Sequence, residues 1–157
     1  MVAGIETGMA TFDTEPKSRA AFEQGAMAGC TLVARRDGNV VGWVALWPVS
    51  PRACYRGVGE VSVYVDPSAA RTGVGAALLG GVQQAAEANG IWTIEAKIFP
   101  DNAASLELHD RCGFRRVGVR EKMGESGGRF RDVVILEWRS HRVGWPVDAS
   151  PQAGERP

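Results

Sequence analysis

The chain has 157 residues, of which 45% are hydrophobic and 23% charged, the composition of one globular domain with a full core. Eighteen basic residues balance eighteen acidic ones, which argues against a nucleic-acid partner and against binding to an anionic membrane surface. The three cysteines lack C-x-x-C spacing and the two histidines belong to no ligand-spaced cluster, so we expect no metal site and a reducing, cytoplasmic setting.

The first half of the chain predicts three strands. Residues 31–36 and 40–47 are rich in β-forming residues and flank a turn at Gly38, a pattern typical of a hairpin. Residues 60–65 alternate between an aliphatic face and a polar face, and the polar face carries Glu60, Ser62 and Tyr64. This strand can bury one face in the core and present the other to a ligand.

The second half predicts two helices and three further strands. Apolar residues at helical spacing from 74 to 86 predict a helix that stops at Gly90. Gly80 and Gly81 inside this helix each cost about 1 kcal/mol relative to Ala, which suggests close packing on the sheet. A further strand is predicted at residues 91–99 and a second helix at 102–112. The chain then predicts an antiparallel pair of strands at 115–122 and 129–138, joined by a glycine-rich turn at 124–128.

The junction between the strand at 60–65 and the first helix predicts an anion-binding turn. Glycines let the main chain approach a ligand closely, and a helix N-terminus offers free N–H groups and a positive dipole end. Ala76 and Ala77 replace the Lys-Ser of a P-loop, and Leu78 replaces the third small residue of a dinucleotide turn. The glycine pair alone more often marks a tight turn with close helix packing than a phosphate site.

The second predicted helix carries hydrogen-bonding groups on one face. Asn102, Ser105 and His109 stand at i, i+3 and i+7, and Gly113 is placed to end the helix. Taken alone, a histidine in such a position is often a satisfied surface residue.

These segments together resemble the GNAT N-acetyltransferase superfamily, whose acetyl-CoA-binding core combines an Arg-x-Gly-x-Gly turn with a downstream Asn-x-x-Ser-x-x-x-His-x-x-x-Gly-Phe sequence. Residues 10–16, 51–55, 60–65 and 128–134 further resemble the phosphinothricin and methionine sulfoximine acetyltransferase group. The resemblance runs through residues 10 to 138. It implies an α/β (α+β) fold with a mixed, mostly antiparallel sheet flanked by helices.

The resemblance also implies acetyl-CoA as cosubstrate. Pantetheine would lie along the strand edge at Val63 and Val65, held by Asn102 and Ser105. Ala70 stands where the family usually has Gln or Arg, so we expect weakened affinity for CoA. The pyrophosphate would rest on the main chain of Arg71, Thr72, Gly73, Val74, Gly75 and Ala76.

By resemblance, Glu60 is the general base that deprotonates the amine through water, against the alternative of a solvated glutamate. His109 takes the position of a general acid or base, and the direction of its proton transfer stays open. Arg52 is the candidate anchor for a substrate carboxylate, although it can also be a plain loop charge. Phe12 and Tyr55 are candidates for an apolar substrate wall, with a core role as the alternative for Phe12.

The implied reaction is acetylation of a small amino acid analogue such as phosphinothricin or methionine sulfoximine. A protein N-terminus, a polyamine or an aminoglycoside stays open as the acceptor. A non-catalytic CoA-binding remnant stays open as an alternative to an enzyme.

Relatives of the group are commonly dimers, so we expect a homodimer. They also begin with a strand and most of a helix before Thr11, so we expect that first strand to be absent. Residues 1–140 should form the single domain and 141–157 a flexible tail.

Overall fold

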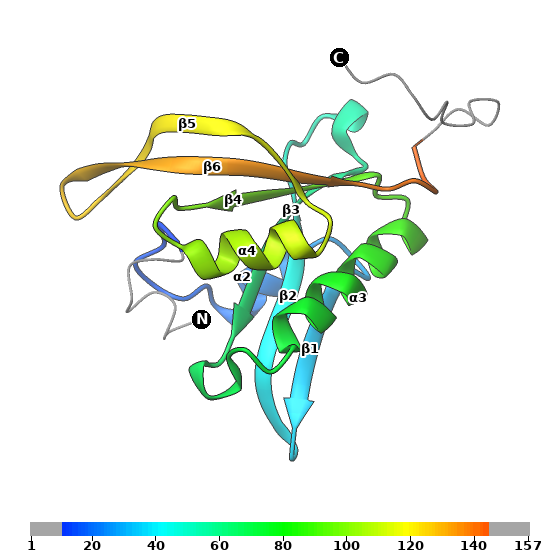
Figure 1. Ribbon diagram of the computed structural model, residues 1–157. Coiled ribbons are helices and arrows are strands. Elements are labelled where there is room, and N and C mark those ends of the chain that lie inside the picture. Colours follow the sequence, from blue (N-terminus) through cyan, green and yellow to red (C-terminus); the bar gives the residue numbers. More distant parts are fainter. Residues whose placement is uncertain (1–10, 145–157) are drawn as a thin grey trace.

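Six strands form one mixed sheet in the order β1-β2-β3-β4-β6-β5 in the computed structural model, which describes residues 11–144 (Figure 1). Only β3 and β4 run parallel, and every other neighbouring pair is antiparallel. The predicted α+β architecture is confirmed. The strands are β1 (Thr31–Arg36), β2 (Asn39–Pro48), β3 (Val58–Val65), β4 (Thr93–Ile98), β5 (Arg115–Ser126) and β6 (Arg129–Arg139).

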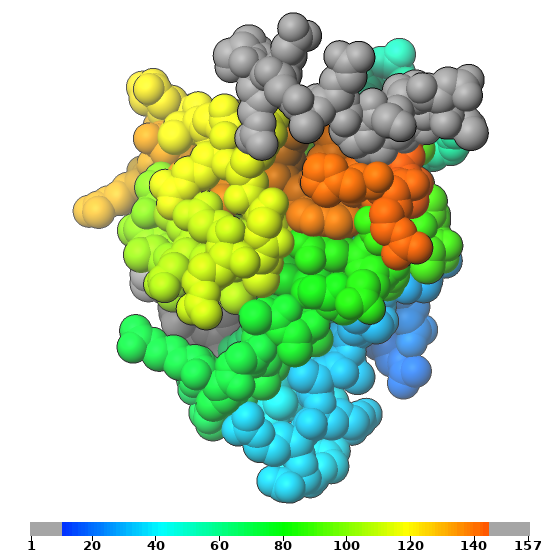
Figure 2. Space-filling view, turned by 45° about the vertical axis from the view of Figure 1, so that its right-hand side comes forward, coloured from blue at the N-terminus to red at the C-terminus, as the bar shows by residue number. Residues whose placement is uncertain are grey.

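The helices lie on opposite faces of this sheet. Alternation along β2 sends Val44 and Leu46 into the main core with α3, and it sends Trp43 and Trp47 to the other face, where Phe22 of α2 contacts both rings. On the face of the sheet that carries the main core, α3 (green in Figure 2) lies between the light-blue β1–β2 hairpin and the orange end of β6. The α-helices are α2 (Arg19–Gly25), α3 (Val74–Ala88) and α4 (Ala103–Arg111), with short 3-10 turns η1 (Ala53–Tyr55) and η2 (Pro67–Ala69).

Several element boundaries differ from those predicted. The short helix α2, capped by Ser18, has no counterpart among the sequence-based predictions. The strand predicted from residue 91 starts at Thr93, because the N–H group of Ile91 bonds to the carbonyl of Ala86 in α3 instead of to a sheet partner. The turn predicted over 124–128 is wrong at its start: β5 continues through a bulge, and only residues 127 and 128 form the turn.

Gly80 and Gly81 have different surroundings. A Cβ on Gly81 would lie 2.9 Å from Cδ1 of Leu32 on β1, which confirms close packing there. A Cβ on Gly80 would meet nothing within 4 Å, so the same expectation is wrong for Gly80.

Gly80→Ala should therefore stabilise the protein, because the methyl group fits and alanine loses less backbone entropy in a helix. We expect the free energy of unfolding to rise by about 0.5–1 kcal/mol, measured by urea denaturation. Gly81→Ala is the matched control and should gain less, since Leu32 must move to admit the methyl group. A Gly80→Ala protein that is no more stable than the wild type would contradict this account.

Two predictions concern residues outside the described part of the chain. The predicted absence of a first strand concerns residues 1–10, and most of the predicted tail is residues 145–157. No helix within the described part of the chain is long and apolar enough to cross a membrane.

Candidate active site

The site begins where β3 and β4 part. Their parallel pairing covers only three positions and ends at the pair of Glu60 with Glu95. Beyond this point β3 stays paired with β2 as far as Val65, and β4 stays paired with β6 as far as Ile98. Each strand thus follows its own half of the sheet, which leaves the facing main-chain edges of residues 61–65 and 96–98 available to a ligand.

A cavity lies in the gap between the two strands. Its volume of about 500 Å³ is typical of small-molecule sites. Its lining includes Val61 and Val63, which pack against the main core, and Glu60, Ser62 and Tyr64, which alternate with them and face the other way. The predicted division of β3 into an aliphatic and a polar face is confirmed. Because both faces contribute, the cavity passes through the sheet from the α3–α4 side to the α2 side.

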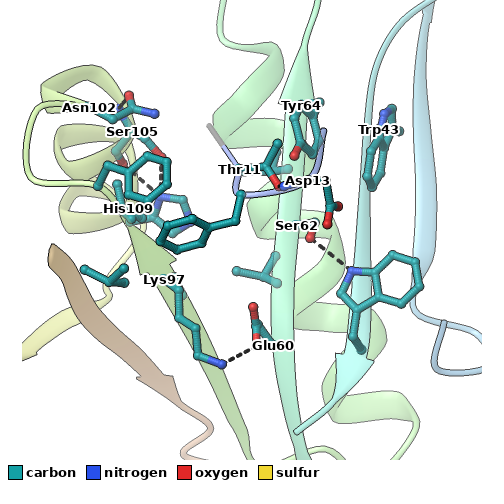
Figure 3. A pocket seen from close by; sticks show the side chains of 18 of the residues that line it. Thr11, Asp13, Trp43, Glu60, Ser62, Tyr64, Lys97, Asn102, Ser105 and His109 are labelled. Carbon is teal, nitrogen blue, oxygen red and sulfur yellow. Dashed lines mark hydrogen bonds and ion pairs between the residues drawn. The ribbon is translucent and has the colours of Figure 1, made fainter. Parts of the chain in front are cut away.

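The wall on the α4 side carries the predicted polar stripe. Asn102, Ser105 and His109 all line the cavity and project from one face of α4 (Figure 3). Asn102 caps the helix by accepting a hydrogen bond from the Ser105 N–H at 3.1 Å, and Gly113 follows the helix with a φ of 84°. The predicted helix, its cap and its terminator are confirmed.

His109 is only 2% exposed, which rules out the alternative of a surface histidine. Its Nδ1 lies 2.8 Å from the carbonyl oxygen of Ser105, an acceptor, so Nδ1 carries the proton and Nε2 carries the lone pair. Nε2 is buried without a hydrogen-bond partner among the described residues. Burial lowers the pKa of His109 below 6.5, with the bond to Ser105 opposing the shift, so the ring is neutral at pH 7.

The lowered pKa of His109 has a consequence for stability. The unfolded chain takes up a proton on this residue as the pH falls through its ordinary value of 6.5, whereas the folded chain does not, so acidification favours unfolding. We expect the melting temperature of the wild type to fall more than that of His109→Gln when the pH is lowered from about 7.5 to about 5. Parallel melting curves for the two proteins would contradict a buried neutral histidine.

The two glycines of the predicted anion-binding turn have separate roles. Gly73 immediately precedes α3 with a φ of 85°, and a Cβ there would meet nothing within 4 Å, so its main chain borders open space. A Cβ on Gly75 would lie 2.9 Å from Cδ2 of Leu108, which makes Gly75 a close-packing residue between α3 and α4. Within residues 11–144 no side chain caps the first turn of α3, so its N–H groups are available to an anion.

Two arginines adjoin this turn. Arg71 is exposed with a φ of 58°. Arg36, which sequence reasoning missed, donates from Nη2 to Oγ1 of Thr72 at 3.0 Å, while that hydroxyl donates to the carbonyl of Ala69 at 2.7 Å. Arg36 is the last residue of β1, and only the folded hairpin brings its guanidinium to the turn. The turn therefore combines main-chain donors with two positive charges.

Aromatic side chains form the wall on the α2 side. Trp43 stacks on Tyr64 with ring centroids 4.8 Å apart, and Nε1 of Trp47 donates to Oγ of Ser62 at 3.0 Å. Burial raises the pKa of Tyr64, so the phenol keeps its proton. Sequence reasoning missed both tryptophans, although their alternation with Val44 and Leu46 is the signal that could have revealed a second, aromatic face of β2.

Charged groups complete this wall in two ion pairs. Glu60 pairs with Nζ of Lys97 on β4 (Figure 3). Asp13 pairs with Nζ of Lys17 at 3.0 Å. The side chains of Glu60 and Lys97 are 33% and 30% exposed. Partly exposed pairs of this kind contribute no more than about 1 kcal/mol, so a ligand can open them.

The structure separates the three predicted substrate residues. Phe12 lines the cavity and packs edge-on against Phe99 with ring centroids 4.8 Å apart, so it belongs both to the wall and to a small core cluster. Arg52 and Tyr55 do not line the cavity. They are exposed and stack on each other, with the guanidinium 5.7 Å from the ring centroid. Within residues 11–144, no group of His, Cys, Asp and Glu side chains is arranged to hold a metal ion.

A parted parallel strand pair, a glycine turn before a helix and a buried histidine beside the gap together match the fold of an acyltransferase. The acetyltransferase (GNAT) family profile matches residues 5–114, and the chain belongs to this family. It is an N-acetyltransferase.

Within this family, the chain is similar to phosphinothricin and methionine sulfoximine acetyltransferases. The chain is 36% identical to the phosphinothricin N-acetyltransferase of Alcaligenes faecalis, over 85% of this chain and 71% of that protein. It is 32% identical to the L-methionine sulfoximine/L-methionine sulfone acetyltransferase of Pseudomonas aeruginosa, over 74% and 69% of the two chains. A phosphinothricin acetyltransferase from Sinorhizobium meliloti, solved in complex with acetyl-CoA, superposes with a TM-score of 0.76 at 25% identity, covering 100% of this chain and 92% of that one. The predicted resemblance is confirmed.

Proposed function

We propose that this protein transfers an acetyl group from acetyl-CoA to the primary amine of a small amino acid analogue of the phosphinothricin or methionine sulfoximine type. The observation that carries the proposal is the cavity through the sheet. Acetyl-CoA would enter from the α3–α4 side, with its phosphates on the turn before α3, and the amine would enter from the α2 side. The two substrates would then meet in the parting between β3 and β4.

The residues present fit acetyl-CoA on two counts. The open space at Gly73, with uncapped N–H groups and the guanidinium groups of Arg36 and Arg71, suits a pyrophosphate. The free edge of β3 at Val63 and Val65 suits the amide groups of pantetheine, with Asn102 and Ser105 on the opposite wall. When bound, acetyl-CoA supplies the activated acetyl group.

The residues of the chain must take protons from the ammonium and supply one to the sulfur. Acetylation joins the amine nitrogen to the acetyl carbon and breaks the C–S bond, so an ammonium loses two protons, the sulfur gains one, and one proton reaches solvent. Glu60, on the acceptor side, takes the first proton directly or through a water molecule. His109 is neutral with its lone pair on Nε2, so it starts as an acceptor. We assign it the second proton, which it then returns to the departing sulfur.

The test is thiol release from acetyl-CoA across a panel that holds phosphinothricin, L-methionine sulfoximine, common amino acids, spermidine, an aminoglycoside and an N-terminal peptide. We expect turnover to be fastest with the amino acid analogues. Fastest turnover with the polyamine, the aminoglycoside or the peptide would replace the proposed substrate. Binding of acetyl-CoA without turnover of any amine would identify a non-catalytic remnant.

Gly73→Val should weaken CoA binding at least tenfold, which corresponds to about 1.4 kcal/mol. The valine side chain would project into the open space beside the α3 N-terminus, and a φ of 85° also disfavours a β-branched residue. Calorimetry measures the affinity, and a melting curve verifies that the variant folds. Gly75→Ala is the control, because its methyl group meets Leu108 and should lower stability more than it lowers CoA affinity. Unchanged affinity in Gly73→Val would remove this turn from the CoA site.

We further propose that the protein is a homodimer formed through β5. This strand lies at the edge of the sheet and exposes apolar side chains, with Val117 at 51% and Val119 at 58%. Light scattering should give twice the chain mass, and Val119→Lys should shift it toward the monomer. A wild-type monomer at micromolar concentration would contradict this proposal.

We also propose a cytoplasmic location, supported by three unpaired thiols, Cys30, Cys54 and Cys112. Cell fractionation tests this location.

A further inference from the structure

The contact between Glu60 and Lys97 joins the two strands at the point where they part. Glu60 ends the parallel ladder on β3, and Lys97 lies two residues beyond its partner Glu95 on β4, on the same face of the sheet. Figure 3 shows the two side chains extended toward each other along one wall of the cavity. Both are about one third exposed, so a ligand in the cavity can reach both charged groups.

The chemistry of an α-amino acid requires two adjacent and opposite partners. Its ammonium and its carboxylate are attached to the same carbon atom, so the protein groups that hold them must be close neighbours. When the ammonium of the substrate lies beside Glu60, its carboxylate must lie nearby. Among the described residues, the nearest cation to Glu60 is Lys97. Lys17, the other cation in the lining, is held by Asp13 at 3.0 Å and lies 5.4 Å from the Trp47 ring centroid.

We propose that Lys97 is the specificity-determining residue that binds the carboxylate of the amino acid while Glu60 holds its ammonium. This inference rests on the proposed function. The zwitterion enters by exchange: one ion pair opens and two charge-assisted contacts form, so neither protein charge is left unpaired. Some amines carry no adjacent carboxylate, such as an amino acid amide, a polyamine or a peptide N-terminus. Such an amine would separate Glu60 from Lys97 and leave the lysine without an anionic partner. The ion pair therefore selects free amino acids.

This assignment moves the carboxylate anchor away from Arg52. Arg52 is exposed on the 51–57 loop, stacks on Tyr55 and does not line the cavity. Lys97 offers a point charge already in contact with the proposed base, which is where the substrate's carboxylate must come to rest.

The test compares L-methionine sulfoximine with its α-carboxamide as acceptors in a thiol-release assay. The wild type should prefer the free acid at least tenfold in kcat/KM. Lys97→Met should abolish this preference by raising KM for the free acid and lowering it for the carboxamide, which no longer has to open an ion pair. Lys97→Arg should keep most of it, because a cation remains. Lys17→Met should leave the ratio between the two substrates unchanged.

The outcomes are separable. A Lys97→Met variant that keeps the wild-type preference, or that loses kcat equally on both substrates, would overturn the role in carboxylate binding; the second result would make Lys97 a positioning residue for Glu60. A wild type that acetylates both compounds equally well would also overturn the inference and leave the N-acetyltransferase function intact. A wild type that acetylates neither would overturn the proposed substrate class together with the inference.

Discussion

Replacing Glu60 by Gln should lower kcat by about 10²-fold or more, the usual effect of removing a general base, and should leave acetyl-CoA affinity nearly intact. Glutamine keeps the size of the side chain and an oxygen that can accept a hydrogen bond from Lys97, but it cannot take a proton from the amine. Steady-state thiol release with acetyl-CoA varied, between about pH 6 and pH 9, measures both effects.

Glu95→Gln is the matched control for this substitution. Glu95 is the register partner of Glu60 in the parallel ladder, yet it does not line the cavity. Its kcat should stay within about twofold of the wild type, the change expected at a site outside the reaction path. Wild-type turnover in Glu60→Gln across the whole pH range would assign the base to another residue.

His109→Gln should lower kcat by about 10²-fold as well, because the substitution removes a basic imidazole from a residue that lines the cavity. The wild-type rate should show no limb near 6.5 that depends on His109, since burial lowers the pKa of this residue. His141→Gln, at the other, exposed histidine, should leave kcat unchanged. If His109→Gln folds and turns over at the wild-type rate, His109 is only a packing residue beside Phe114.

The features that could be predicted from sequence are those that local chemistry determines. The alternation of residues 60–65 fixes which side chains face the core and which face the cavity, because strand geometry has a period of two. The Asn102 cap and the Gly113 terminator likewise define α4 and place Ser105 and His109 on one face. The burial of His109 could not be predicted from sequence, since it depends on the fold, which packs its ring edge-on against Phe114 with ring centroids 4.9 Å apart.

The features that sequence reasoning missed depend on register between distant strands. Glu60 and Lys97 are 37 residues apart, and their contact exists only because β3 pairs with β4 in one register and then parts from it. Arg36 reaches Thr72 for the same kind of reason, through the position of the hairpin beside the turn. The chemistry of Arg52 and its nearness in sequence to Glu60 make it a candidate, and the structure places it on an exposed loop at the start of η1, outside the cavity lining.

The central claim is that acetyl-CoA and the amine occupy the two sides of one cavity at the same time and react directly. The most direct test is initial-rate thiol release with acetyl-CoA and L-methionine sulfoximine both varied. Direct transfer predicts intersecting double-reciprocal lines and no thiol release without the amine. Parallel lines, with a burst of thiol before the amine is added, would mean that an acetylated side chain carries the group, and would contradict the account.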